Sequence, residues 1–157
     1  MLTSNVLLRS LRRSLQHVRP VSFKVGDSAS LTKAFSEKDV EDFARISLDA
    51  NPMHIDVEAG RQSIFGQRVV HGVLTLGLLS AVMAQKIPGE GCILMDMNFK
   101  CPAPLYIDEE VTAQVTVTEI KGRKMTLHML CSETDNKVVI EGGVTVLAPK
   151  EKAADAL

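Results

Sequence analysis

The chain has 157 residues with 18 basic and 19 acidic side chains, a formal net charge of −1 and a length that suits one ordinary domain. A hydrophobic content of 45% and a charged content of 24% are typical of a globular protein and exclude a disordered chain. The near-zero charge and the aromatic content of only 4% argue against a dedicated nucleic-acid binder. The three cysteines form no CxxC pair, so we expect reduced, mostly buried thiols without a disulfide framework or a zinc site.

Residues 1–19 differ from the rest of the chain in charge. They contain four arginines and no acidic residue, which leaves 14 basic against 19 acidic side chains, a net −5, for the remainder. Leucines recur at helical spacing among these arginines, a pattern typical of a mitochondrial transit peptide; the alternative is a basic N-terminal helix of the domain. We expect a transit peptide over residues 1–21 and a mature protein in the mitochondrial matrix. No apolar run reaches the roughly 20 residues of a membrane span, so no membrane association is expected.

The first predicted elements are a strand and a helix. Residues 30–35 alternate between polar and apolar side chains, which predicts a strand. Ser36 and Asp39 have the spacing of a capping arrangement, and the helical stripe that follows ends near Asp49. Pro52 breaks the helical pattern, because the residue before a proline is pushed out of the helical region. Residues 55–70 are expected to be irregular, with one helical turn near residues 57–61.

The second half of the chain predicts a core helix followed by strands. Residues 72–84 are apolar at every position except Thr75 and Ser80, which predicts a central helix that is buried on all faces. Four strands are predicted over residues 92–99, 110–120, 124–132 and 137–147, and the glycine pair at 142–143 predicts a bulge or a close approach by another backbone. The architecture is α+β, a sheet curled around one helix, with a frayed tail over residues 149–157.

Candidate chemistry is concentrated between Asp49 and Gly72. Asp49 and His54 are five residues apart across the proline-broken loop, so they could converge on one water molecule as an acid–base pair, worth ~10²–10⁴ in rate. From spacing alone other roles stay open: a local cap for Asp49, a hydrogen-bonded loop residue for His54, or a metal cluster with Asp56. Gly72 opens the central helix, where unpaired N–H groups make a candidate oxyanion site, and His71 before it is a candidate capping or packing residue.

Two segments resemble a known family. Residues 48–56 (LDANPMHID) and 65–72 (FGQRVVHG) resemble the hydratase-2 motif of the MaoC-like, R-specific enoyl-CoA hydratases. The resemblance extends over about residues 22–148, which we take as the domain. It implies a hot-dog fold, a long helix wrapped by an antiparallel sheet, usually paired as a homodimer. It also implies that Asp49 and His54 form the catalytic dyad, that Gly72 donates its backbone N–H to the thioester carbonyl, and that the substrate site includes Asn51, Ser63 and His71.

The resemblance also implies a reaction. A (3R)-3-hydroxyacyl thioester loses water to give a trans-2-enoyl thioester, with no metal or other cofactor, because the thioester itself acidifies C2. The acyl group is carried on acyl carrier protein or on CoA, and the basic residues expected to dock such anionic carriers are Arg61, Arg68, Lys100 and the turn at residues 121–124. With the Arg-rich leader, the resemblance favours the dehydratase of mitochondrial fatty acid synthesis. The alternatives are an R-specific enoyl-CoA hydratase of a degradative route and a non-catalytic acyl-thioester-binding protein.

Overall fold

The computed structural model describes residues 22–149. The predicted transit peptide over residues 1–21 and residues 150–157 of the predicted tail therefore lie outside the described residues. Within the described part the elements, in chain order, are β1 (Ser28–Ala34), α2 (Glu37–Ser47), α3 (Pro52–Ile55), α4 (Val57–Gln62), α5 (Gly72–Gln85), β2 (Ile93–Lys100), β3 (Glu110–Lys121), β4 (Lys124–Glu133) and β5 (Val138–Leu147).

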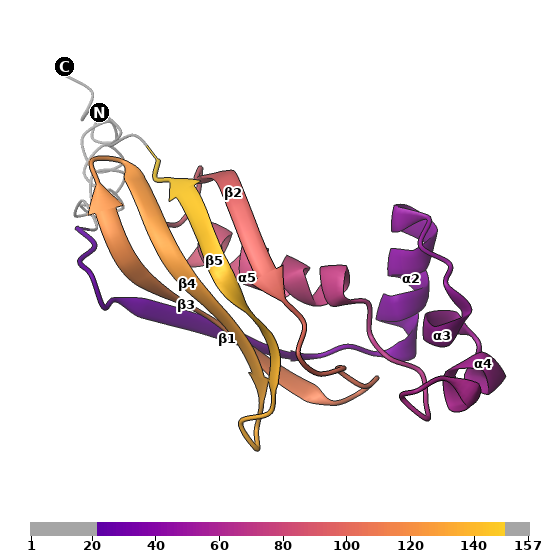
Figure 1. The fold of residues 1–157 in the computed structure, drawn as a ribbon. Helices are drawn as coiled ribbons and strands as arrows, with labels where there is room; N and C mark the ends of the chain where they lie inside the picture. The colour runs from indigo at the N-terminus through magenta and orange to yellow at the C-terminus, as the bar shows by residue number, and fades with distance from the viewer. Residues whose placement is uncertain (1–21, 150–157) are drawn as a thin grey trace, which may run out of the picture.

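The strands form one antiparallel sheet in the order β1-β3-β4-β5-β2, and α5 packs across one of its faces (Figure 1). The short helices α2, α3 and α4 form a separate lobe beyond one end of α5. A curved antiparallel sheet around one central helix is the hot-dog fold, so the predicted α+β architecture is confirmed. Each of the five predicted strands is present with ends shifted by no more than two residues.

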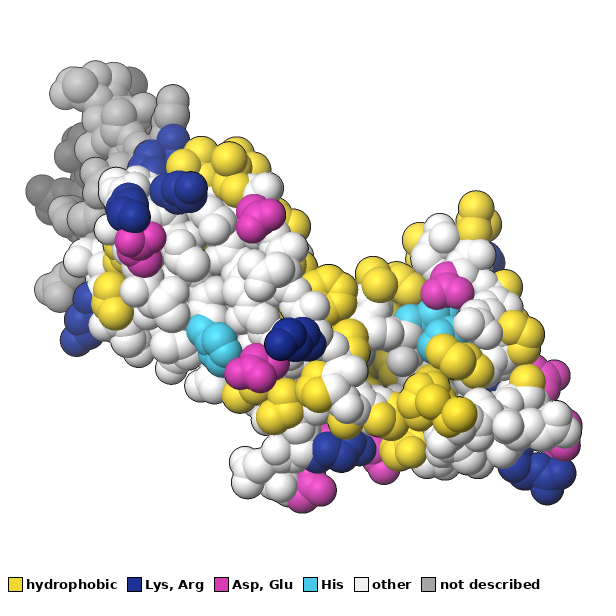
Figure 2. All heavy atoms as spheres, viewed as in Figure 1, with side chains coloured by type: hydrophobic (Ala, Val, Ile, Leu, Met, Phe, Trp, Pro, Cys, Tyr) yellow, Lys and Arg dark blue, Asp and Glu magenta, His cyan; other side chains and the backbone are white. Residues whose placement is uncertain are grey.

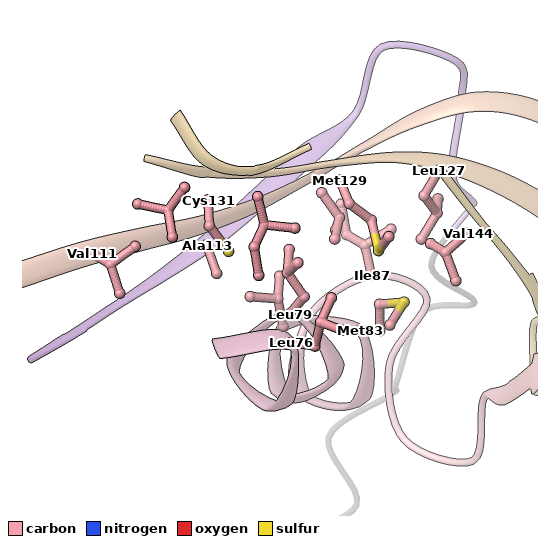
Figure 3. Packing of buried hydrophobic residues seen from close by; sticks show 14 of the residues in the cluster. Leu76, Leu79, Met83, Ile87, Val111, Ala113, Leu127, Met129, Cys131 and Val144 are labelled. Atoms are coloured by element: carbon pink, nitrogen blue, oxygen red, sulfur yellow. The ribbon is translucent and has the colours of Figure 1, made fainter. Parts of the chain in front are cut away.

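The core lies between α5 and the inner face of the sheet (Figure 3). Leu76, Leu79 and Met83 of α5 point toward the alternating buried side chains of β3, β4 and β5. In β3 these are every second residue from Val111 to Val117, which is the period-2 pattern that buries one face of a strand.

The prediction that α5 is buried on all faces is wrong for the single chain. Val73, at the start of the helix, is 61% exposed, and exposed positions recur along one side at Gly77, Ser80 and Ala84. The sheet also leaves apolar side chains uncovered on its edge strand β2, namely Ile93, Leu94, Met95 and Phe99. Burial against the sheet explains the apolar residues on one side of α5, but it does not explain those on the exposed side.

Gly142 confirms the close backbone approach that the glycine pair predicts. A Cβ atom added at Gly142 would lie 2.1 Å from the carbonyl oxygen of Asn98 in the neighbouring strand β2. Only a residue without a side chain fits there. None of the helices in residues 22–149 is long and apolar enough to cross a membrane.

Candidate active site

The loop between α2 and α3 delivers Asp49. The predicted capping box is present, because the Ser36 hydroxyl accepts from the Asp39 N–H and the Asp39 carboxylate accepts from the Ser36 N–H. At the other end of α2, Leu48 adopts a left-handed conformation (φ 64°), which turns the chain out of the helix. Asp49 follows immediately, and its Oδ1 accepts from the N–H of Asn51 at 3.3 Å. The carboxylate is thus held at an exposed turn.

Pro52 begins a helix where the sequence predicts a loop. Proline suits the first helical position, since its φ is already helical and the N–H that it lacks would have no intrahelical partner. The side-chain oxygen of Asn51 caps this helix by accepting from the Met53 N–H. The single turn of α3 places His54 inside the protein, with only 6% of its surface exposed.

His54 is held by one ring nitrogen. Its Nδ1 lies 2.7 Å from the carbonyl oxygen of Val69. A carbonyl can only accept, so Nδ1 carries the proton, and the neutral ring keeps its lone pair on Nε2. Nε2 has no hydrogen-bond partner among residues 22–149 and is the nitrogen available for proton transfer.

The structure brings Asp49 and His54 together, as the motif predicts, and adds His71. One ligand-type atom from each of these three residues lies within 4.8 Å of the others. The metal cluster that includes Asp56 is not formed, because the Asp56 carboxylate caps α4 by accepting from the Ala59 N–H at 2.7 Å. Figure 2 shows a small patch of histidine atoms in the α2–α4 lobe, with an acidic side chain beside it and hydrophobic side chains around it.

His54 and Gly72 line one cavity of about 290 Å³. Its walls are mostly apolar, as is usual for a site that binds a small organic group. Gly72 is the first residue of α5, and a Cβ added there would lie 3.4 Å from the sulfur of Cys101. The remaining lining residues are Met53, Phe65, Val69, Val70, Thr75, Cys101–Leu105, Val139 and Ile140.

The three residues predicted to contact substrate make local contacts in the single chain. The Asn51 side-chain oxygen caps α3. The Ser63 hydroxyl donates to the Gly60 carbonyl at 2.7 Å and accepts from the Phe65 N–H at 3.1 Å, so it stabilises its own turn. His71 is 1% exposed and does not line the cavity, and its side chain does not cap α5. The structure therefore supports local structural roles for these three residues.

Several residues that line the cavity are not predicted from the sequence. Thr75 follows Gly72 by three residues, and this helical spacing, which puts both on one face of α5, could have indicated it. Cys101, expected to be a core thiol, is instead exposed at the cavity wall. Cys131 is buried as expected, and its burial, with a smaller effect of Cys101, raises the pKa of its thiol to about 12. The side chains of Val139 and Ile140 reach the cavity from β5, which no local pattern reveals.

The basic residues predicted to dock an anionic carrier are largely paired. Arg61 pairs with Glu58, Arg68 with Glu37, and Lys121 with Glu119. Arg123 donates two hydrogen bonds to the Ala148 carbonyl. In the described part of the chain only Lys100 and Lys124 of this set form neither an ion pair nor a side-chain hydrogen bond, so the expected patch is small.

Comparisons with known proteins agree with this fold. A family model described as the MaoC like domain matches residues 14–139. An (R)-specific enoyl-CoA hydratase from Rhodospirillum rubrum is 41% identical over 128 residues, covering 80% of this chain and 88% of that protein. A mitochondrial 3-hydroxyacyl-[acyl-carrier-protein] dehydratase from Arabidopsis thaliana is 31% identical over 131 residues, covering 80% and 78%. The structure of the (R)-hydratase from Aeromonas caviae superposes with a TM-score of 0.79 at 31% identity, covering 82% of this chain and 99% of that one.

The fold and these similarities define the class as a hydro-lyase of the enoyl-CoA hydratase and 3-hydroxyacyl dehydratase type. The chain belongs to the MaoC-like family of (R)-specific enoyl-CoA hydratases and 3-hydroxyacyl dehydratases.

Proposed function

We propose that this protein catalyses the reversible dehydration of (3R)-3-hydroxyacyl thioesters to trans-2-enoyl thioesters, with Asp49 and His54 as the dyad and Gly72 as the oxyanion donor. The observation that carries the proposal is the convergence of three parts at one place. The Asp49 carboxylate lies beside His54, and His54 shares a cavity with the first residue of α5.

Gly72 stabilises the charge that develops on the thioester oxygen. Its N–H belongs to the first turn of α5, where backbone donors have no intrahelical partner and the helix dipole favours negative charge. Removal of the C2 proton from the acyl chain moves electron density onto the thioester oxygen. A backbone donor aimed at that oxygen lowers the barrier without needing to reorganise.

His54 relays the proton, and Asp49 holds the hydroxyl group. In dehydration, Nε2 of His54 takes the C2 proton, and the ring then delivers a proton to the hydroxyl that leaves C3 as water. The imidazolium that forms between these events is stabilised by the Nδ1–H bond to the Val69 carbonyl. Asp49 accepts a hydrogen bond from the same hydroxyl and fixes its direction. Hydration follows the reverse path, with water held between the two side chains.

Different observations support a synthetic and a degradative role for the reaction. The Arg-rich start of the chain and the mitochondrial relative from A. thaliana support a dehydratase of mitochondrial fatty acid synthesis. The greater identity to the R. rubrum hydratase supports the alternative, an R-specific enoyl-CoA hydratase of a degradative route. We favour the synthetic role, in the mitochondrial matrix, with residues 1–21 as a transit peptide and residues 22–148 as the catalytic domain. A fusion of residues 1–25 to a fluorescent reporter should then enter mitochondria, and a diffuse cytosolic signal would refute this location.

We also propose a homodimer. An edge strand with exposed apolar side chains and a central helix with an uncovered apolar side leave surface that a second copy would bury. The family resemblance predicts the same assembly.

The direct test of the activity is hydration of crotonyl-CoA by the full chain. We expect loss of the enoyl absorbance and formation of the (3R)-3-hydroxy product, which a chiral analysis of the acid released by hydrolysis identifies. Absence of turnover on both short and medium enoyl thioesters would contradict the proposal and favour a non-catalytic acyl-thioester-binding protein.

The carrier is tested by matched substrates. Acyl-carrier-protein and CoA thioesters of the same chain length share the pantetheine arm, so a difference in kcat/KM reports contacts with the carrier itself. The synthetic role predicts a higher kcat/KM for the carrier-protein thioester across chain lengths. A consistent preference for CoA would favour the degradative role.

A further inference from the structure

The ring of His71 is enclosed between two helices of the lobe. It stacks on His54, with ring centroids 3.8 Å apart and planes inclined by 28°. Phe43 of α2 meets it edge-on, with centroids 5.0 Å apart and planes inclined by 61°. Only 1% of the surface of His71 is exposed, so the ring is closely packed by its neighbours.

The polar contact of His71 reaches the carboxylate loop. Its Nε2 lies 3.0 Å from the backbone carbonyl oxygen of Asp49, 22 residues earlier in the chain. The carbonyl can only accept, so Nε2 carries the proton and donates it. Nδ1 is buried and has no hydrogen-bond partner in the described structure. The side chain therefore makes one directed bond, and that bond fixes the peptide group of Asp49.

His71 is suited to hold this bond in the neutral state. Its burial lowers the pKa of the ring, and the neighbouring His54 lowers it further, against opposing effects of Asp49. Asp49 and His54 are the titratable groups that face the ring, whereas α2 contributes the apolar Phe43. A second proton on Nδ1 would be a buried N–H without an acceptor. The ring is therefore unsuited to carry protons itself.

We propose that His71 is a positioning residue of the hydro-lyase site, which fixes the Asp49 loop and the His54 ring relative to the N–H of Gly72. This inference rests on the proposed function. Four consecutive residues, Val69 to Gly72, hold the parts of the site. The Val69 carbonyl accepts from His54, the His71 ring stacks on His54 and donates to the Asp49 carbonyl, and Gly72 is the proposed oxyanion donor. One short stretch of backbone thus sets the spacing of the whole site.

Two variants separate the contacts of His71. His71→Gln keeps a neutral N–H donor at a similar reach and removes the ring, whereas His71→Phe keeps a stacking ring and removes the donor. Val82→Ala, which removes equally buried atoms near the other end of α5, is the control for lost packing. The kcat and KM on crotonyl-CoA are measured for each folded variant.

A positioning role predicts a fall in kcat without a matching rise in KM, because His71 does not line the cavity. We expect kcat to fall by about 10²-fold in His71→Phe, the size of effect that a misplacement of about 1 Å causes. His71→Gln should lose less activity than His71→Phe, because it keeps a donor for the Asp49 carbonyl. Val82→Ala should leave kcat and KM unchanged. A kcat like that of the wild type in both His71 variants would overturn the inference and leave the proposed function standing.

A measurement on the wild-type chain covers the case in which the variants fail to fold. Long-range ¹H–¹⁵N spectra report which ring nitrogen of each histidine is protonated. We expect Nε2 of His71 to carry a proton at neutral pH, because only then can it donate to the Asp49 carbonyl. A His71 ring with its proton on Nδ1 alone would overturn the inference, whether or not the protein turns over enoyl thioesters.

Discussion

Gly72 begins α5 and is the proposed oxyanion donor, a role that requires room for a ligand. A Cβ at this position would lie 3.4 Å from the Cys101 sulfur, so the protein itself tolerates a methyl group with a small adjustment. In the proposed mechanism the thioester oxygen approaches the backbone N–H beside this position. The proposed oxyanion role therefore accounts for a glycine at position 72 better than packing does.

We therefore predict that Gly72→Ala folds but loses activity. The added methyl group keeps the thioester oxygen at a distance from the N–H, and kcat/KM should fall by about tenfold or more, less than the ~10²–10³-fold cost of deleting an oxyanion donor. Steady-state hydration of crotonyl-CoA and a thermal melt measure the two effects separately. Gly77→Ala, a change on the same helix with no atom within 4 Å of the added Cβ, is the matched control. Equal activity in the two variants would exclude Gly72 from the oxyanion site.

At the scale of elements, the pairing of β2 with β5 depends on Gly142. Phe99 and Gly142 are partners in register, and an added Cβ at Gly142 would lie 2.1 Å from the Asn98 carbonyl and 2.7 Å from the Phe99 Cα. These neighbours are backbone atoms of another strand and cannot rotate away. The two strands would have to separate at this point.

Gly142→Ala should therefore destabilise the fold by at least about 3 kcal/mol, the upper range for overpacking. Gly143→Ala is the matched control, since its nearest neighbour lies 3.7 Å from the added Cβ. Urea unfolding followed by circular dichroism compares the two. Similar free energies of unfolding for both variants would show that the strands can absorb the methyl group.

Sequence patterns predict elements better than they predict how elements meet. Alternation locates the strands, the Ser36–Asp39 spacing locates the start of α2, and the glycine pair locates the close approach of two strands. The helix that starts at Pro52 does not follow from the pattern, because a proline that ends one helix can also begin the next. The contacts of His71 with His54 and Asp49 join residues 17 and 22 positions apart, and only the folded chain shows them.

At the scale of the whole molecule, the proposed homodimer would account for the apolar composition of α5 and β2. A helix with apolar side chains on all faces is expected to be covered on all faces, and the single chain covers only the side toward the sheet. The exposed side chains of β2 add to the same argument. Association of two copies through these surfaces would bury the apolar side chains that the single chain exposes to water.

We predict that Met95→Asp weakens the homodimer. Met95 is 59% exposed on the edge strand, and a carboxylate there would be desolvated and repelled in a symmetric contact. Light scattering during gel filtration should give twice the chain mass for the wild type and a shift toward one chain mass for the variant. Val25→Asp, at a 62% exposed position before the opposite edge strand, should remain dimeric. A wild type that elutes as a single chain would refute the dimer.

The most direct test of the account is the turnover of two dyad variants. Asp49→Asn and His54→Ala remove the proposed hydroxyl-holding carboxylate and the proposed proton relay, one at an exposed turn and one in a single-turn helix, so the sheet and its core should stay intact. Each should lower kcat for crotonyl-CoA hydration by about 10²–10⁴-fold. Circular dichroism and melting temperature should remain close to those of the wild type. Wild-type rates in either folded variant would contradict the assignment of the dyad.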